Sequence, residues 1–305
     1  MSGNDLIEFR TAYLRLIARS WIYPAYAKWV VGLSPSELIE HLRQDYNFDW
    51  PWPALEISLK DDGAKWQPQQ TSGWYGKGFS GQLIVKLPLV KSCIQGSDAE
   101  KLRPLALADF YAVRHSIFGR PQDPTHPPTT EAGLPIKLGV SEDRFLEFSA
   151  VMVRALALAW DDEEFKDHLL NPSSCLPALA GWLGYTSPWN MNIVVQNDYD
   201  AVWVVPQKFK QIPTGECGTV TEGQESADRW NGWQPKNSQP DSKHTDSTKQ
   251  SGTTLSKNRL VLHLPQCPYE QQGKDEKTGD ILGIIPIALA AYNQTGPAYP
   301  FTCCP

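Results

Sequence analysis

The chain has 305 residues, of which 41% are hydrophobic and 20% are charged. This is the composition of a globular protein with room for two domains of ordinary size, each able to bury its own core, and it excludes an intrinsically disordered chain. The net charge is −6 at neutral pH and no block of basic residues occurs, which excludes nucleic acid and anionic membrane surfaces as expected partners.

A helix with one buried face is the first predicted element. Its apolar residues fall three or four apart, at Leu6, Phe9, Tyr13, Leu16 and Ile17. A later helix is predicted to begin where Ser34 can cap, Pro35 fits the first helical position and Glu37 can reach back. Alternating apolar residues then predict a short strand over residues 55–59.

Four glycines precede the next predicted strand, residues 83–88. They are Gly73, Gly76, Gly78 and Gly81. A phosphate-binding loop would instead follow a strand and open a helix. The glycines therefore predict a hairpin or a bulge.

Residues 145–195 predict three short helices and a strand. The first helix has its apolar residues at Phe145, Phe148, Met152, Leu156 and Ala159. The second follows Trp160 and begins at the acidic run 161–164, whose carboxylates can accept from the free N–H groups of the first turn. The third helix stops at Gly184. The strand has alternating apolar residues at Met191, Ile193 and Val195.

The same order of elements near the start of the chain indicates an internal duplication. Trp21 and Tyr26 keep the spacing of Trp160 and Phe165, which lie 139 residues further on. Three more pairs of segments recur in the same order: Trp66-Gln67-Pro68 with Trp233-Gln234-Pro235, Leu83 to Pro88 with Leu260 to Pro265, and Pro104 to Ala108 with Pro286 to Ala290.

We therefore predict an α+β fold of two homologous halves, each a small helical group followed by short antiparallel strands and a further helix. The first repeat covers residues 1–119, a proline-rich linker covers 120–139 and the second repeat covers 140–295. Within the second repeat, the polar residues 236–258 predict a disordered insertion. Residues 296–305 are predicted to form a flexible tail.

Neither a signal peptide nor a membrane span is expected. Residues 1–5 are polar and lead into an amphipathic helix, without a signal-peptide core. The longest apolar run, residues 281–292, contains a proline and is too short to cross roughly 30 Å of hydrocarbon. We expect a cytoplasmic protein whose product can be exported.

No ordinary catalytic site is predicted. The chain has no metalloprotease helix, Walker loop or nucleophile elbow, and its six histidines are scattered. The acidic run 161–164 stands at a helix start, where capping is the default role, and His168 in the same helix is expected at the surface or its boundary. Cys175 is expected to be a small core residue. We expect no enzyme activity, no metal and no cofactor.

The chain ends in Phe301-Thr302-Cys303-Cys304-Pro305. The glycine and prolines of residues 296–305 disfavour a regular element, so the two thiols are expected to be accessible. Adjacent cysteines bond to one another only with strain, and two ligands make an incomplete metal site. The residues alone leave two interpretations, a reactive surface pair that oxidises and a metal-scavenging end.

One stretch of the second repeat carries a family resemblance. It reads Arg154-Ala155-Leu156-Ala157-Leu158-Ala159-Trp160 and then Phe165-Lys166-Asp167-His168-Leu169-Leu170-Asn171-Pro172. It resembles the leader segment related to the nitrile hydratase alpha subunit. Together with the Phe-Thr-Cys-Cys-Pro ending, it makes most of the chain similar to the thiazole/oxazole-modified microcin (TOMM) precursors. These are bacteriocin-type ribosomal peptides in which a leader precedes a short core rich in Cys, Ser or Thr.

The resemblance implies that the protein is a substrate and not a catalyst. A partner cyclodehydratase would make the thiols of Cys303 and Cys304 attack the preceding carbonyls, and a flavin dehydrogenase would aromatise the rings. Thr302 would react less readily, because a hydroxyl is the weaker nucleophile. A sister precursor is a further candidate partner. By the same analogy, the residues of the leader-docking face would be Trp160, Phe165, Leu169, Leu170, Trp21 and Tyr26.

Two other classes of protein stay open. One is a non-catalytic partner-binding or structural protein with a reactive terminal thiol pair. The other is a nitrile-hydratase-like metalloenzyme, but the metal loop of that family interleaves three cysteines and a serine. The terminus of this chain has only Cys303 and Cys304 to offer, with no third ligand.

Overall fold

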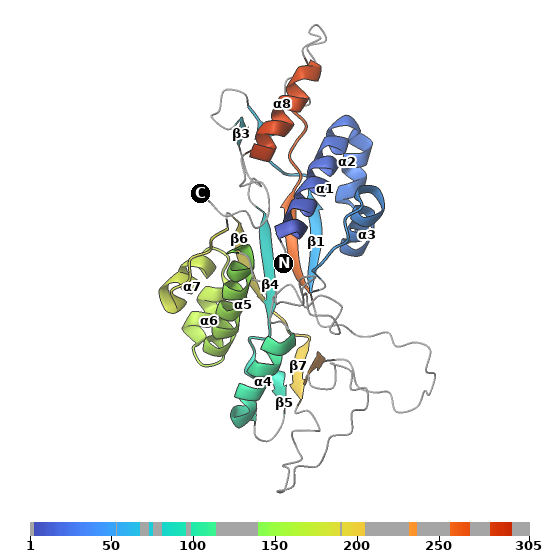
Figure 1. The fold of residues 1–305 in the computed structure, drawn as a ribbon. Helices are drawn as coiled ribbons and strands as arrows, with labels where there is room; N and C mark the ends of the chain where they lie inside the picture. The colour runs from blue at the N-terminus through green and yellow to red at the C-terminus, as the bar shows by residue number, and fades with distance from the viewer. Residues whose placement is uncertain are drawn as a thin grey trace, which may run out of the picture.

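The computed structural model describes residues 3–52, 54–67, 73–75, 81–95, 99–113, 140–189, 191–204, 232–236, 257–268 and 281–294. Helices and strands are mixed in these ranges, which confirms the α+β class (Figure 1). The helices are α1 Gly3–Ile22, α2 Pro24–Val31, α3 Pro35–Tyr46, α4 Ala99–Val113, α5 Val140–Ala159, α6 Glu163–Leu170, α7 Cys175–Leu183 and α8 Ile281–Gln294. The strands are β1 Leu55–Lys60, β2 Lys65–Trp66, β3 Trp74–Tyr75, β4 Gln82–Leu87, β5 Ile94–Gln95, β6 Asn192–Asn197, β7 Ala201–Val204, β8 Trp233–Pro235 and β9 Asn258–His263, and a 3-10 turn covers Lys91–Cys93.

The helix ends follow the capping signals of the sequence. At the start of α3, Ser34 Oγ accepts from the backbone N–H of Glu37 at 3.4 Å, and the Glu37 carboxylate accepts from the Ser34 N–H at 2.8 Å. At the end of α7, Gly184 has a φ of 67°, the left-handed conformation that a residue without Cβ adopts most easily. Both predicted helix boundaries are confirmed.

The central sheet has the strand order β1-β9-β4-β6. Strands β1 and β9 are parallel, β9 and β4 are antiparallel, and β4 and β6 are parallel. The expectation of short antiparallel strands is therefore wrong for two of the three pairings. Alternation in a sequence reveals which face of a strand is buried but not the direction of its neighbour.

Two smaller sheets flank the central one. In the first, β2 and β3 pair antiparallel with Trp66 opposite Trp74. In the second, of order β5-β7-β8, strands β7 and β8 pair antiparallel with Trp203 opposite Trp233. Trp66 thus lies in the earlier strand of its antiparallel pair along the chain, whereas Trp233 lies in the later strand of its pair. The predicted match of Trp66 with Trp233 rests on the Gln-Pro sequence that follows both residues, and the two residues differ in their place in their sheets.

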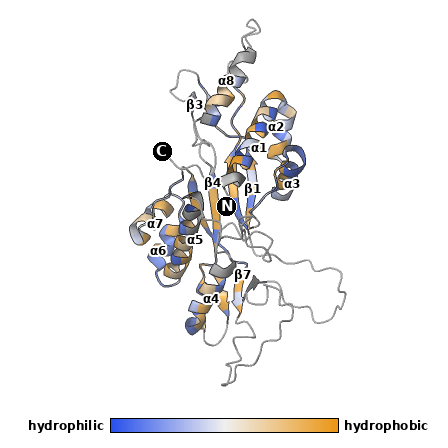
Figure 2. Cartoon of the chain, viewed as in Figure 1, coloured by the Kyte–Doolittle hydropathy of each residue, from blue (hydrophilic) through white to orange (hydrophobic). Residues whose placement is uncertain are grey.

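The two helical groups lie on opposite sides of the central sheet, with α1 to α3 beside β1 and α5 to α7 beside β6 (Figure 1). Apolar residues gather on the strands between them, most clearly on β4 (Figure 2). The buried residues of both halves form one hydrophobic cluster, which includes Leu16, Leu83, Leu156 and Leu260. The ranges 1–119 and 140–295 therefore share one core instead of each burying its own.

The polar segment that was predicted as a disordered insertion, residues 236–258, ends earlier than expected. Asn258 begins β9 and is fully buried, and its Oδ1 accepts from the backbone N–H of Lys86 at 2.8 Å. In the sequence, Asn258 looks like one more residue of the polar segment that precedes it. Its role as the acceptor for a backbone N–H could therefore not be predicted. Residues 237–256 and the linker 120–139 lie outside the described residues. Among the described helices, none is both long enough and apolar enough to span a membrane.

Candidate functional site

The helices α5, α6 and α7 pack around a group of aromatic and aliphatic side chains. Phe148 on α5 lies 5.2 Å from the ring of Trp189 and 5.9 Å from that of Tyr185, measured between ring centroids. Phe148, Met152 and Leu156 are all fully buried, as the spacing of the predicted apolar stripe requires. We call residues 140–197, which contain these helices and β6, the second helical module.

The acidic run at residues 161–164 starts α6, as expected. Asp162 Oδ1 accepts from the backbone N–H of Phe165 at 2.9 Å, and Glu163 and Glu164 occupy the first turn. Negative charge at this end is stabilised by the helix dipole, so these carboxylates have a structural role. His168 is exposed, and its ring lies 5.5 Å from that of Trp182, which is itself 44% exposed.

Trp160 and Trp21 occupy matching places at the ends of α5 and α1. The indole Nε1–H of Trp160 donates to the carbonyl of Pro88 at 2.9 Å, and that of Trp21 donates to the carbonyl of Pro265 at 2.8 Å. Both indoles are buried, so each bond also satisfies a donor that water cannot reach. The two tryptophans fix their helices to the ends of β4 and β9.

The six predicted docking residues belong mainly to the core. Their exposed fractions are 2% for Trp160, 0% for Phe165 and Leu169, 5% for Trp21 and 9% for Tyr26, and Leu170 is half-buried. These side chains hold the helices in place. A partner that approaches the second helical module would meet its exposed residues, among them Trp182 and His168.

The corresponding place in the first half, formed by α1, α2 and α3, contains a polar network that extends from the buried Tyr26 and His41 to the exposed Arg19 and Asp45. The hydroxyl of Tyr26 lies 2.6 Å from His41 Nε2 and 2.7 Å from the hydroxyl of Tyr46, and the guanidinium of Arg19 stacks on the Tyr26 ring while pairing with Asp45. Burial and the bond to Tyr46 raise the pKa of Tyr26, and burial lowers the pKa of His41 despite the nearby Asp45. Both side chains are therefore neutral near pH 7 and serve packing.

Two of the described cysteines, Cys93 and Cys175, are poor nucleophiles. Burial raises the pKa of Cys93 to about 12 and that of Cys175 to about 11. At neutral pH both stay thiols, and the thiolate is the reactive form. Cys175 is confirmed as a core residue. Thr302, Cys303 and Cys304 lie outside the described residues. Their modification therefore remains a prediction from the sequence.

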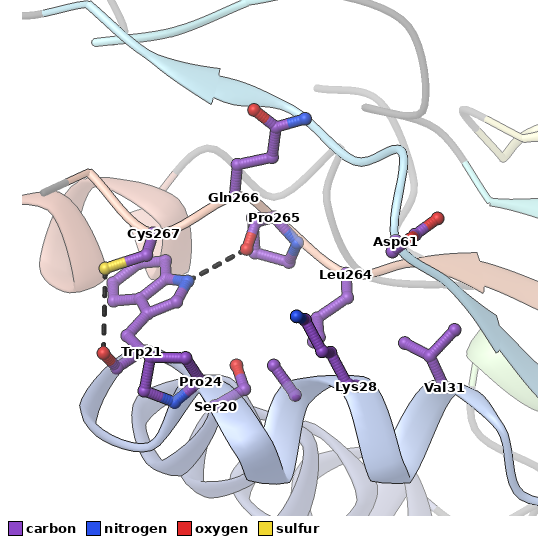
Figure 3. Close-up of a pocket in the computed structure, with 11 residues that line it drawn as sticks. Ser20, Trp21, Pro24, Lys28, Val31, Asp61, Leu264, Pro265, Gln266 and Cys267 are labelled. Atoms are coloured by element: carbon purple, nitrogen blue, oxygen red, sulfur yellow. Dashed lines mark hydrogen bonds between the residues drawn. The ribbon is translucent and has the colours of Figure 1, made fainter. Parts of the chain in front are cut away.

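A cavity of about 400 Å³ lies between α2 and the segment that follows β9 (Figure 3). Trp21 and Pro265 form part of its lining, and Lys28 and Asp61 reach it from different elements. The sequence does not predict this cavity, because no motif marks its lining residues. Its walls come together only through the pairing of β1 with β9. Within the described ranges, no three residues of the metal-ligating types are grouped as a metal site would require.

The second helical module contains most of a segment that matches a known family. Residues 143–216, from α5 to beyond β7, match the model of the ribosomal natural product, two-chain TOMM family. This confirms the resemblance to TOMM precursors over these residues. The extension of the resemblance to most of the chain, the likeness to the nitrile hydratase leader and the role of the terminal Cys-Cys stay predictions. No curated protein and no solved structure matches the chain.

Proposed function

We propose that the folded part of this chain presents a C-terminal Thr302-Cys303-Cys304 tail to azole-forming enzymes, because residues 143–216 match the model of the two-chain TOMM family of ribosomal natural products. The protein is then a precursor and a substrate, and the chemistry belongs to its partners. The family match over residues 143–216 carries this proposal, together with the two adjacent cysteines Cys303 and Cys304 that precede Pro305.

The proposed reaction is a dehydration followed by an oxidation. The Cys303 thiol adds to the Thr302 carbonyl carbon, and the Cys304 thiol adds to the Cys303 carbonyl carbon. Each addition forms a C–S bond and loses the carbonyl oxygen as water, which gives a thiazoline. A flavin dehydrogenase then removes two hydrogens from each ring and reduces its flavin, which gives a thiazole. Thr302 would close more slowly on the carbonyl of Phe301, because its hydroxyl is a weaker nucleophile than a thiolate.

The state of two other cysteines supports this selectivity. Cys93 and Cys175 are buried, and the raised pKa of each thiol disfavours the thiolate. Neither can enter an enzyme cleft unless the core opens. The glycine and prolines of residues 296–305 disfavour a helix or a central strand, which suits a segment that must extend into a foreign active site.

The second helical module is the proposed docking element. Binding of a leader to the modifying enzyme raises the local concentration of the tail at the active site, so that a weak tail–enzyme interaction suffices. Trp160, Phe165 and Leu169 contribute by holding α5, α6 and α7 in one arrangement. The surface that the enzyme contacts would then comprise exposed residues such as Trp182 and His168.

The intact mass of the protein from its native host tests the proposal. We expect a deficit of one water and two hydrogens for each thiazole, and Cys303→Ala and Cys304→Ala should each remove one such deficit. Cys267→Ala is the matched control and should leave the deficit unchanged. Wild-type protein with no deficit, and with both terminal thiols open to alkylation, would overturn the proposal.

A non-catalytic binding protein is the second candidate function. The specific observation in its favour is the cavity beside Trp21, where an ammonium from Lys28 and a carboxylate from Asp61 accompany apolar walls. Such a mixed lining is typical of small-molecule sites. An unmodified tail combined with saturable binding of a small ligand would favour this candidate. Stoichiometric metal in the native protein would instead favour a metalloenzyme.

A further inference from the structure

We infer that the chain is a covalent pseudo-dimer, in which residues 3–113 and 140–294 are two copies of one α/β unit that bind each other as an obligate pair. This inference goes beyond the proposed function and does not depend on it. It names an interaction surface inside the molecule, and the partner that fits this surface is a second copy of the same unit.

The first observation is the pairing of strands. In the described part of the chain, every ladder of the central sheet joins a strand from residues 3–113 to one from residues 140–294: β1 to β9, β9 to β4, and β4 to β6. Either unit alone would have two strands that do not touch each other. A strand without neighbours leaves its backbone donors and acceptors unpaired, so neither unit completes a central sheet by itself.

The second observation is a pair of matching hydrogen bonds at the helix ends. Trp21 of the first unit donates to Pro265 of the second, and Trp160 of the second donates to Pro88 of the first, at 2.8 and 2.9 Å. Pro88 and Pro265 end the two segments that the sequence repeat had already paired. Both bonds cross between units and do so reciprocally, which is the contact pattern of a two-fold dimer.

The third observation is another reciprocal pair at the two ends of the sheet. Trp74 donates to the carbonyl of Ala288 at 2.9 Å, and Trp233 donates to the carbonyl of Ala106 at 2.8 Å. Ala106 and Ala288 are also counterparts in the sequence repeat. Helix α8 thus lies against the β2–β3 sheet of the other unit, and α4 lies against β8 of the other unit (Figure 1).

The contact between the units is apolar and buried. The core residues of β9, Leu260 and Leu262, are 0% and 2% exposed, and Leu83 and Val85 of β4 are 0% and 1% exposed. A continuous core across two subunits is typical of obligate dimers, in which the separate subunits are unstable. By the same geometry, a chain that carried one unit would need a second copy to fold.

Cleavage of the folded full-length chain tests the inference. A protease site is placed within residues 120–130, the purified protein is cut, and its size is measured under native conditions. We expect the two fragments to elute together at the size of the uncut chain. Two folded fragments that elute separately would overturn the inference. If the site resists cleavage, residues 1–119 and 120–305 are produced as separate chains in one cell, and co-purification replaces co-elution.

Matched variants of the cut protein show whether the crossed bonds hold the pair together. Trp74→Phe and Trp233→Phe each remove one crossed hydrogen bond and should weaken fragment association about 5-fold or more, since one such bond contributes about 1 kcal/mol. The control is Trp29→Phe, at a residue that is 50% exposed, with an expected change of less than about 2-fold. Equal effects in all three variants would contradict the crossed arrangement. This experiment measures the association of the two fragments and not the mass of the tail, so it tests the pairing of the units separately from the proposed function.

Discussion

Replacement of Trp160 by phenylalanine separates a structural role from a docking role. Trp160 was predicted to lie on the leader-docking face, but its side chain is 2% exposed and donates to the Pro88 carbonyl. Phenylalanine keeps most of the apolar contact and removes the indole N–H. The variant should therefore unfold more easily, and any loss of tail modification should follow from the loss of folded protein.

The expected magnitude follows from two contributions. Loss of the hydrogen bond costs about 1 to 3 kcal/mol, because the buried Pro88 carbonyl then lacks this donor. The smaller ring also leaves a cavity, which adds roughly 1 kcal/mol, a fraction of the cost of a full tryptophan-to-alanine change. We expect a total loss of about 2 to 4 kcal/mol in the free energy of unfolding. Trp21→Phe should cost a similar amount, because its bond to Pro265 matches in length and burial.

Urea unfolding followed by far-ultraviolet circular dichroism measures these losses without depending on tryptophan fluorescence. Trp182→Phe is the control, since that side chain is 44% exposed and should change stability by less than about 0.5 kcal/mol. Wild-type stability of Trp160→Phe would refute this structural role of Trp160. It is also refuted if that variant stays fully folded and yet loses tail modification, because Trp160 would then contact the enzyme directly.

Three further predictions concern titration and close packing. Burial lowers the pKa of His41, so the stability of the wild-type protein should fall as the pH drops below the ordinary histidine pKa of about 6.5. Unfolding curves recorded at several pH values should show that His41→Phe weakens this dependence of stability on pH. The hydrogen bond to His263 lowers the pKa of Asp62, so the contribution of Asp62 to the free energy of unfolding is full above about pH 4 and is lost as the pH falls through the lowered pKa. Asp62→Asn should remove this acid-dependent loss of stability, and an unchanged dependence of stability on pH in acid would contradict the pairing. A Cβ at Gly232 would lie 2.4 Å from a backbone oxygen of β7, so Gly232→Ala should destabilise the protein by about 1 to 3 kcal/mol. Gly181 lies in α7 with open space around it, so Gly181→Ala should stabilise the protein by about 0.5 to 1 kcal/mol, and thermal unfolding compares the two variants.

Local features of this fold could be predicted from the sequence because their causes are local. The Ser34 cap, the Asp162 cap and the stop at Gly184 each depend on a few neighbouring residues. The core position of Cys175 follows from helical spacing in the same way. These predictions needed no knowledge of the partner element.

Long-range features could not be predicted, because periodicity does not identify the neighbour of a strand. The alternation of residues 55–59 shows that one face is buried, but not that β1 pairs parallel with β9, about two hundred residues away. For the same reason Trp160 could be placed on an apolar helix face without knowing that this face is covered. Its burial by the sheet end at Pro88 became visible only in three dimensions.

Tail modification should depend on the folded part of the chain, and a comparison of two substrates measures this dependence. The full chain and a synthetic peptide of residues 296–305 are incubated, at equal concentration, in lysate of the native host, and the mass of the C-terminal peptide is recorded over time. We expect dehydration and oxidation at Cys303 and Cys304 in the full chain, and at least about tenfold slower change in the isolated peptide, because only the full chain carries the proposed docking element. Equal rates for the two substrates, or an unchanged tail in the full chain, would contradict this expectation.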